Sequence, residues 1–154
     1  MDKERILSDV LTIENKNIIL EFATGTGKTL CAIKLFERTL NRCNHEHKIL
    51  IVIPKLALIK CWIKEFNKWD MSDILPYVEF STYVSFPKNY DKNWIMVCFD
   101  EAHHITDRCF QTIYSSVNRR TINHVFLSAT LSEYFKNKLS FTFPDTVNKK
   151  INLK

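Results

Sequence analysis

The stretch ATGTGKT, residues 23–29, contains both glycines of a chain of 154 residues. At the usual frequency of about 7%, a chain of this length would hold about eleven. Glycine is needed where the backbone takes up conformations, or allows close approaches, that a Cβ atom would block. The other turns of this chain use Asn, Asp, Ser, Pro or Lys, so the two glycines mark one loop with a special requirement.

The segments that flank this loop indicate what approaches it. Residues 17–22, NIILEF, are typical of a buried strand, and apolar residues recur at helical spacing between Lys28 and Asn41. A strand, a glycine loop and a helix that begins with Lys-Thr form the P-loop arrangement, in which backbone N–H groups and the helix N-terminus bind phosphate. We therefore expect a nucleotide site formed by Thr24, Gly25, Thr26, Gly27, Lys28 and Thr29.

Two residues of this loop have specific expected tasks. Lys28 should reach the β- and γ-phosphates, and the hydroxyl of Thr29 should hold Mg²⁺. Phe22 occupies the first position of the pattern G-x-x-x-x-G-K-[ST], so the pattern is incomplete. A turn that merely contains Gly-x-Gly is the alternative interpretation of this loop.

A second motif follows another apolar run. Residues 94–99, WIMVCF, are typical of a strand buried on both faces, and the letters DEAH follow at 100–103. Open α/β sheets bind ligands at the carboxyl ends of their strands. We expect Asp100 to hold the Mg²⁺ that Thr29 also contacts, and Glu101 to orient and deprotonate a water molecule aimed at the γ-phosphate. The alternative is that both acids only stabilise the N-terminus of the next helix.

The motifs FATGTGKT, DEAH and SAT, in this order, resemble the first motor domain of superfamily 2 helicases and translocases. The DEAH-box, type III restriction and XPB-like branches are nearest. Residues 49–69, ILIVIPKLALIKCWIKEFNKW, are similar to motif Ia of that family, and residues 80–86, FSTYVSF, are similar to a segment that reads STY in several members. The resemblance covers about residues 17–131 and implies an N-terminal RecA-like ATP-binding domain of the P-loop NTPase fold.

The resemblance also implies roles for single residues. Glu101 matches the catalytic base, with Lys28 and the metal-binding Asp100 beside it in the catalytic centre. The residues that match those coupling the nucleotide site to nucleic-acid binding are His103, Ser128 and Thr130. Those that would lie on the face contacting a nucleic-acid strand are Pro54, Lys55, Ser81 and Thr82.

Several of these assignments have simpler alternatives. Lys55 is equally well explained as a solvated lysine at a helix start, and Ser81 with Thr82 as a turn or a helix cap. Three aromatic residues at helical spacing favour a core position over a platform for stacking bases; they are Trp62, Phe66 and Trp69.

The alternation of apolar strands with helical segments predicts a single α/β domain over 1–154, with a mostly parallel sheet and helices on both faces. Strands are expected near 17–22, 48–53, 77–82, 94–99 and 124–128. Helices are expected near 28–42, 56–68, 105–118 and 131–138. Residues 140–154 are expected to supply an edge strand and a tail.

The family pattern implies ATP and Mg²⁺ as cofactors and a nucleic-acid strand as partner, and we expect DNA rather than RNA. Family members usually read adenine through a glutamine upstream of the P-loop, whereas the sole glutamine here is Gln111. They also hold ATP between two RecA-like domains, and the second supplies an arginine finger, worth on the order of 10³–10⁵ in rate in related NTPases. The pair Arg119-Arg120 is interpreted as solvated loop residues. We expect the second domain on another chain, with weak hydrolysis in its absence; a binding regulator without useful turnover is the alternative.

Composition restricts the function less than the motifs do. The net charge of +5 is compatible with anionic partners but too mild to predict them. No apolar run approaches the roughly 20 residues of a membrane helix and no signal-peptide pattern opens the chain, so we expect no membrane contact and a cytoplasmic location, or the nucleic-acid compartment of the host cell, rather than secretion. The five single cysteines should be reduced thiols packed as small hydrophobes, and the histidines lack the spacing of a zinc site.

Overall fold

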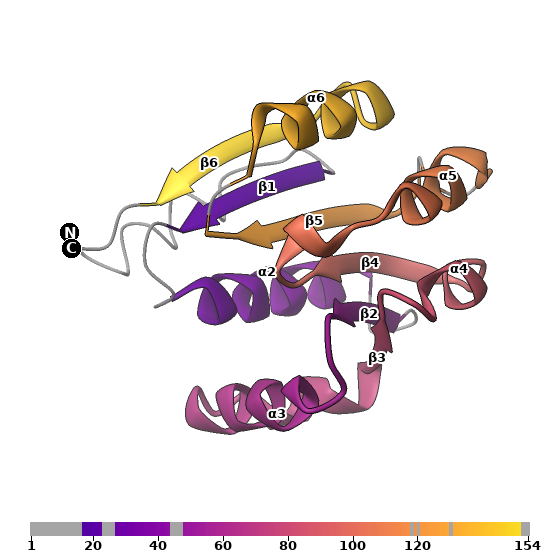
Figure 1. Ribbon diagram of the computed structural model, residues 1–154. Coiled ribbons are helices and arrows are strands. Elements are labelled where there is room, and N and C mark those ends of the chain that lie inside the picture. Colours follow the sequence, from indigo (N-terminus) through magenta and orange to yellow (C-terminus); the bar gives the residue numbers. More distant parts are fainter. Residues whose placement is uncertain are drawn as a thin grey trace.

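The computed structural model describes residues 17–22, 27–43, 48–117, 119, 121–129 and 131–151, the segment 147–151 at the level of the backbone. Within this part, strands form one sheet in the order β3-β2-β4-β5-β1-β6, and every neighbouring pair is parallel. In Figure 1 the arrowheads of β6, β1 and β5 accordingly point the same way. The strands are β1 (Asn17–Phe22), β2 (Lys48–Ile53), β3 (Val78–Thr82), β4 (Trp94–Phe99), β5 (Asn123–Ser128) and β6 (Val147–Ile151).

The strand predictions are confirmed to within one residue at each end. The expected edge strand also exists, since β6 lies at the margin of the sheet and pairs with β1. Long apolar runs such as β4, where every residue is buried, form the centre of a parallel sheet because helices cover both of its faces.

Helices connect the strands, and two short 3₁₀ segments, η1 and η2, accompany them. Their bounds are α2 (Lys28–Arg42), α3 (Leu58–Lys68), η1 (Ser72–Tyr77), α4 (Phe86–Asn89), η2 (Ala102–His104), α5 (Asp107–Ser115) and α6 (Glu133–Thr142). The sequence patterns predict neither η1 nor α4.

Three helices differ at their ends from the expected ranges. Helix α3 begins at Leu58 rather than near 56. Helix α5 is shorter at both ends, because the hydroxyl of Thr106 caps its first turn and an extended residue, Ser116, ends it. Helix α6 continues past the expected end near 138, because Leu139 and Thr142 are buried.

The two faces of the sheet bury separate apolar clusters. Along β1, Leu20 packs into the cluster that contains buried residues of α2 and α3, whereas Ile19 packs into the cluster beneath α4, α5 and α6. This alternation follows from the period of two residues in a strand. Together with the matches to solved domains given below, it confirms the predicted α/β fold with helices on both faces.

Two features of composition can now be placed. Cys31, Cys98 and Cys109 are buried as expected of thiols that pack as small hydrophobes, but Cys61 is exposed. Within the described residues, no helix is both long and apolar enough to span a bilayer.

The strand order determines which motifs meet. Strand β5 lies between β1 and β4, so three segments leave neighbouring strands at the same edge of the sheet. These are the start of α2 after β1, the DEAH residues after β4, and Ser128 at the end of β5.

Candidate nucleotide site

Helix α2 begins at the last glycine of the loop. Gly27 is the N-cap residue with φ of 96°, a left-handed conformation that favours glycine, and its carbonyl accepts a hydrogen bond from Cys31 N at 3.0 Å. Lys28 and Thr29 follow in the first turn. Thr24, Gly25 and Thr26 lie outside the described residues, so their contacts to phosphate stay predictions.

Lys28 joins the two motifs. Its Nζ lies 3.3 Å from Asp100 Oδ1 and forms an ion pair with Glu101 Oε1. Burial lowers the pKa of Lys28, but the two neighbouring carboxylates outweigh that effect, and the net pKa is raised above its ordinary value. The lysine is therefore charged at neutral pH. It links the start of α2 to the acids that follow β4, and 73 positions separate Lys28 from Glu101 in the sequence.

Asp100 is buried at the carboxyl end of β4. Its side-chain oxygen Oδ2 accepts a hydrogen bond from Trp62 Nε1 at 3.0 Å, and its backbone N–H donates to Val52 O at 2.9 Å. Oxygen Oδ1 is also buried, yet among the described residues it has no hydrogen-bond partner beyond its ion-pair contact with Lys28. A buried carboxylate oxygen with spare acceptor capacity is costly unless it serves a ligand.

Glu101 has an unusual backbone. Its φ of 52° is positive, which in the described part of the chain is shared, outside glycine, by Asp70 alone. Such a conformation costs of the order of 1–3 kcal/mol and persists where surrounding contacts enforce it. The Glu101 side chain is about one third exposed, with Oε2 placed 3.7 Å from His103 Nδ1.

The alternative role of the two acids as a helix cap is not what the contacts favour. The cap residue of α5 is Thr106, whose hydroxyl accepts a backbone hydrogen bond. Glu101 precedes η2 without a side-chain capping bond in the described structure.

The residues predicted to couple this site to nucleic acid are partly brought together. Ser128 Oγ, which is buried, lies 3.5 Å from His103 Nδ1, at the long limit of a hydrogen bond. Thr130 lies outside the described residues. The coupling role itself stays a prediction.

The four residues predicted to face nucleic acid differ in exposure. Lys55 is exposed after β2, with Pro54 half-buried beside it. Ser81 is buried and its hydroxyl accepts from Asn89 Nδ2 at 3.0 Å, which argues against a nucleic-acid contact by its side chain.

Thr82 fits the turn interpretation, because its hydroxyl accepts the backbone N–H of Ser85 at 3.2 Å. Arg119 is not simply solvated, since its guanidinium lies 4.5 Å from the Tyr114 ring and donates to the Tyr114 carbonyl at 2.6 Å. Arg120 lies outside the described residues.

Two residues of the site escape sequence reasoning. The first is Trp62, which lies in the core with Phe66 as expected but also donates its indole N–H to Asp100. The second is Tyr83, whose hydroxyl donates to the Asp100 carbonyl at 2.6 Å. A buried Trp or Tyr needs an acceptor for its N–H or O–H, so the sequence signals that a partner exists without showing which one.

The donor set fits Mg²⁺. This cation prefers oxygen ligands, and the site offers Asp100 Oδ1, which lacks a hydrogen bond within the described structure, beside the first turn of α2 that carries Thr29. Asp100 and Thr29 are therefore the residues that would hold the ion, and a bound Mg²⁺ would neutralise phosphate charge there.

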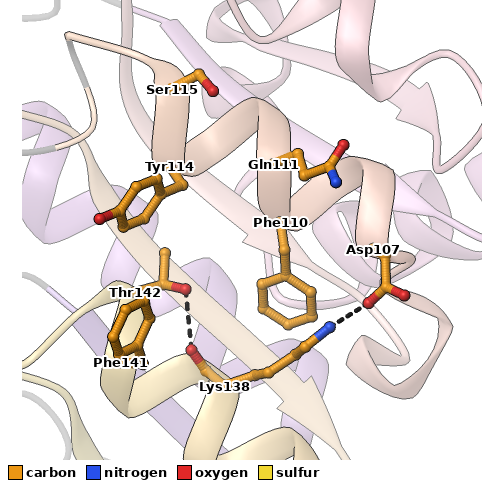
Figure 2. A pocket seen from close by; sticks show the side chains of 8 residues that line it. All are labelled: Asp107, Phe110, Gln111, Tyr114, Ser115, Lys138, Phe141 and Thr142. Carbon is orange, nitrogen blue, oxygen red and sulfur yellow. Dashed lines mark hydrogen bonds and ion pairs between the residues drawn. The ribbon is translucent and has the colours of Figure 1, made fainter.

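A cavity of about 430 Å³ lies elsewhere, between α5 and α6 (Figure 2). Lys138 extends along it toward Asp107, with which it forms an ion pair, and the rings of Tyr114 and Phe141 stack at a centroid distance of 6.0 Å. The lining residues are Asp107, Phe110, Gln111, Tyr114, Ser115, Lys138, Phe141 and Thr142. None of the residues predicted for the nucleotide site lines this cavity.

A glycine-capped helix, a lysine in its first turn and a strand-terminal Asp-Glu pair on a parallel sheet define the class of P-loop NTPase domains with a RecA-like fold. The chain belongs to the family described as "Type III restriction enzyme, res subunit", whose sequence pattern matches residues 3–84, just over half of the chain.

Solved structures show the same fold. The UvsW helicase of bacteriophage T4 is 20% identical with a TM-score of 0.74, over 97% of this chain and 58% of that one. The Hef helicase domain of Pyrococcus furiosus is 16% identical with a TM-score of 0.71, over 97% and 38%. The DEAD-box helicase Mss116, bound to ssRNA and UDP-BeF, is 17% identical with a TM-score of 0.68, over 97% and 39%. No curated protein sequence matches the chain.

The family match and these structures confirm the predicted N-terminal domain of a superfamily 2 helicase or translocase. The chain has the fold of a helicase-type P-loop NTPase domain, and it spans less than two thirds of each solved helicase named above.

Proposed function

We propose that this chain binds ATP–Mg²⁺ where α2 meets the end of β4, and that it is the ATP-binding half of a DEAH-type, nucleic-acid-dependent ATPase. The observation that carries the proposal is the contact of Lys28 with both Asp100 and Glu101. A nucleoside triphosphate requires this arrangement, in which a lysine opens a glycine-capped helix and faces two acids at the end of a strand.

The charges of this cluster favour a dication beside the proposed nucleotide. Lys28 carries one positive charge, and Asp100 with Glu101 carries two negative charges, so the three sum to one negative charge. This sum opposes a triphosphate unless a dication screens it. In the proposed complex Lys28 leaves its carboxylate partners for the phosphates, and Glu101, which is already one third exposed, becomes available as the base for water.

Efficient hydrolysis in this proposal needs more than one domain. Arg119 does not supply the charge of an arginine finger, because its guanidinium is held against the Tyr114 ring and carbonyl. We propose that a second RecA-like domain on another chain supplies this charge, and that nucleic acid binds across both. DNA rather than RNA is proposed, because the family's description names a restriction enzyme subunit.

The test is nucleotide binding and ATP hydrolysis by the purified chain, with and without DNA or RNA. We expect ATP–Mg²⁺ binding, weak turnover, and loss of binding in Lys28→Ala. Glu101→Gln should retain binding and lose the remaining turnover, because the amide cannot accept the proton of water.

A matched control is Lys34→Ala, which removes a partly exposed lysine of the same helix whose nearest carboxylate, that of Glu37, lies at 4.0 Å. It should bind nucleotide as the wild type does. Absence of nucleotide binding by the wild type would overturn the proposed function. Fast DNA-stimulated turnover by the chain alone would overturn the need for a second domain.

A further inference from the structure

Asp100 is held by two aromatic side chains that belong to other segments of the chain. Trp62, on α3, donates its indole N–H to the carboxylate oxygen Oδ2 at 3.0 Å. Tyr83, in the turn after β3, donates its hydroxyl to the Asp100 carbonyl at 2.6 Å. Trp62 is 3% exposed and Tyr83 6% exposed, so both bonds lie away from solvent.

The indole bond determines where the second carboxylate oxygen points. With Oδ2 fixed by Trp62, rotation of the carboxylate is restricted, and Oδ1 lies 3.3 Å from Lys28 Nζ. Oδ1 is buried, and within the described residues it forms this ion-pair contact with Lys28 but no hydrogen bond. Outer partners that orient a ligating oxygen in this way commonly tune the affinity of metal sites.

Trp62 is itself held in place by aromatic packing. Its ring stacks near Phe36 of α2, with centroids 6.1 Å apart and an interplanar angle of 26°, and lies 6.3 Å from Phe66 of its own helix. The indole cannot turn away from Asp100 without disrupting this cluster, so its N–H is oriented before any ligand binds.

Tyr83 acts on the main chain of the same motif. Its hydroxyl also lies 3.4 Å from the carbonyl of Glu101, the residue with positive φ, and its ring stacks near Phe99 at 6.3 Å. Burial, followed by the charge of Asp100, raises the pKa of Tyr83 well above its ordinary value, so the hydroxyl remains a donor. The contact opposes relaxation of the turn at Glu101.

We propose that Trp62 and Tyr83 are positioning residues of the nucleotide site: Trp62 directs Oδ1 of Asp100 toward the magnesium position, and Tyr83 fixes the turn that presents Glu101. This inference rests on the proposed function and assigns neither residue a contact with nucleotide. The inference has a specific consequence for nucleotide binding. Loss of the bond from Trp62 or from Tyr83 should weaken the gain in nucleotide affinity that Mg²⁺ gives, and should leave nucleotide affinity without metal unchanged.

The chain offers a matched pair of tryptophans on one helix for the test. Trp69, which follows the last residue of α3, donates its indole N–H to Glu65 Oε2 at 2.9 Å, a carboxylate outside the cluster of Lys28, Asp100 and Glu101. Trp62→Phe and Trp69→Phe therefore each remove one indole–carboxylate bond. Binding of a fluorescent ATP analogue would be measured in EDTA and then across a Mg²⁺ titration.

In Trp62→Phe we expect the Mg²⁺ concentration for the half-maximal gain in affinity to rise about tenfold to a hundredfold, with affinity in EDTA unchanged. Trp69→Phe should retain the wild-type requirement. Equal Mg²⁺ requirements in Trp62→Phe and Trp69→Phe would overturn the proposal. If the wild type itself fails to bind the analogue, the proposed function falls, and the inference falls with it.

A measurement on the unaltered chain covers the case in which Trp62→Phe does not fold. In ¹⁵N-labelled protein the indole N–H of Trp62 gives its own NMR resonance, distinguished from those of Trp69 and Trp94 by the corresponding Trp→Phe variants. Adding Mg²⁺ to the nucleotide complex should shift the Trp62 resonance and leave that of Trp69 in place. An unshifted Trp62 resonance would overturn the role assigned to this side chain.

Tyr83→Phe removes one hydroxyl, and Tyr90→Phe is its control. The Tyr90 hydroxyl bonds to His124 in the core, 2.8 Å away and apart from the site. Tyr83→Phe should raise the Mg²⁺ requirement roughly threefold to tenfold, the equivalent of one hydrogen bond. The same rise in both variants would show a general effect of core loosening and would overturn the role of Tyr83.

Discussion

Two buried carboxylates lie at the carboxyl ends of two strands of the sheet, Glu21 in β1 and Asp100 after β4, and their surroundings differ. Glu21 is 4% exposed, and each of its oxygens has a partner: Lys136 Nζ lies 3.0 Å from Oε1, and Leu131 N donates to Oε2 at 3.2 Å. Asp100 is 6% exposed, and its Oδ1 has no hydrogen bond among the described residues; its ion-pair contact there is with Lys28 Nζ at 3.3 Å, a lysine that is also paired with Glu101.

This difference separates a carboxylate that stabilises the fold from one prepared for a ligand. A buried charge with complete partners holds its neighbours together, and removing one partner is costly. A buried oxygen with an incomplete set of partners lowers stability and gains its missing interactions when a cation binds. Glu21 and Asp100 should therefore respond in opposite ways to the loss of charge.

The largest effect is expected for Asp100→Asn. Mg²⁺-dependent tightening of ATP binding should fall more than about a hundredfold, because altering merely an outer partner of a metal ligand already costs about 10–100-fold. The free energy of unfolding should change by less than about 1 kcal/mol, since the amide can still accept from Trp62 and Lys28 keeps its ion pair with Glu101. Chemical denaturation and a Mg²⁺ titration check the two halves of this prediction. A large loss of stability would place Asp100 with Glu21 among the structural groups.

Glu21→Gln should show the opposite pattern. We expect the free energy of unfolding to fall by about 2 kcal/mol, at the low side for a buried pair because Lys136 is 17% exposed and can hydrate. The Mg²⁺ requirement of the folded fraction should stay at its wild-type value. Urea denaturation measures the first quantity.

A double variant separates the pair itself from other effects of the substitution. Glu21→Gln combined with Lys136→Met should lose less stability than the sum of the two single variants, because the two side chains interact. Strict additivity would show that the ion pair contributes nothing to stability.

The contrast between the two acids also shows what the sequence can reveal. The order of the apolar runs predicts the strands, and the strand-terminal position of Asp100 predicts that it lies near Lys28, which the structure shows. The hydrogen bond from Trp62 joins residues 38 apart. Helical spacing assigns Trp62 to the buried face of α3, but it does not determine which acceptor the indole reaches.

Glu21 illustrates the converse limit. It stands in an apolar run, where the sequence gives no sign of a partner, and its partners come from the segment around α6, 110 residues away in the case of Leu131. Side-chain contacts of this range depend on the completed packing of the sheet. The short α4 and η1 escape prediction for a related reason, since each has too few residues to show a period.

His124 extends the comparison to a buried group at the start of β5, away from the nucleotide site. Its Nε2 lies 2.8 Å from the Tyr90 hydroxyl, and its Nδ1 lies 2.9 Å from Asn17 Oδ1. Because the amide oxygen can only accept, Nδ1 carries the proton and Nε2 accepts from Tyr90. Like Glu21, this side chain has partners at both polar atoms, but it is buried without charge.

The smallest effect is expected from the titration of His124. Burial lowers its folded-state pKa from 6.5 to about 3, so between these values the unfolded chain binds a proton that the folded chain does not. Above pH 6.5 the neutral ring in both states leaves the free energy of unfolding unaffected by the titration of this group. As the pH falls below 6.5, protonation of the unfolded chain lowers the free energy of unfolding, by about 1 kcal/mol between pH 7 and pH 5.5. Urea denaturation at the two pH values, for the wild type and for His124→Asn, measures this contribution. The variant should lose less stability over this interval. An equal slope in His124→Asn would show that the ring is protonated without cost, which would require its hydrogen bonds to Tyr90 and Asn17 to be dispensable.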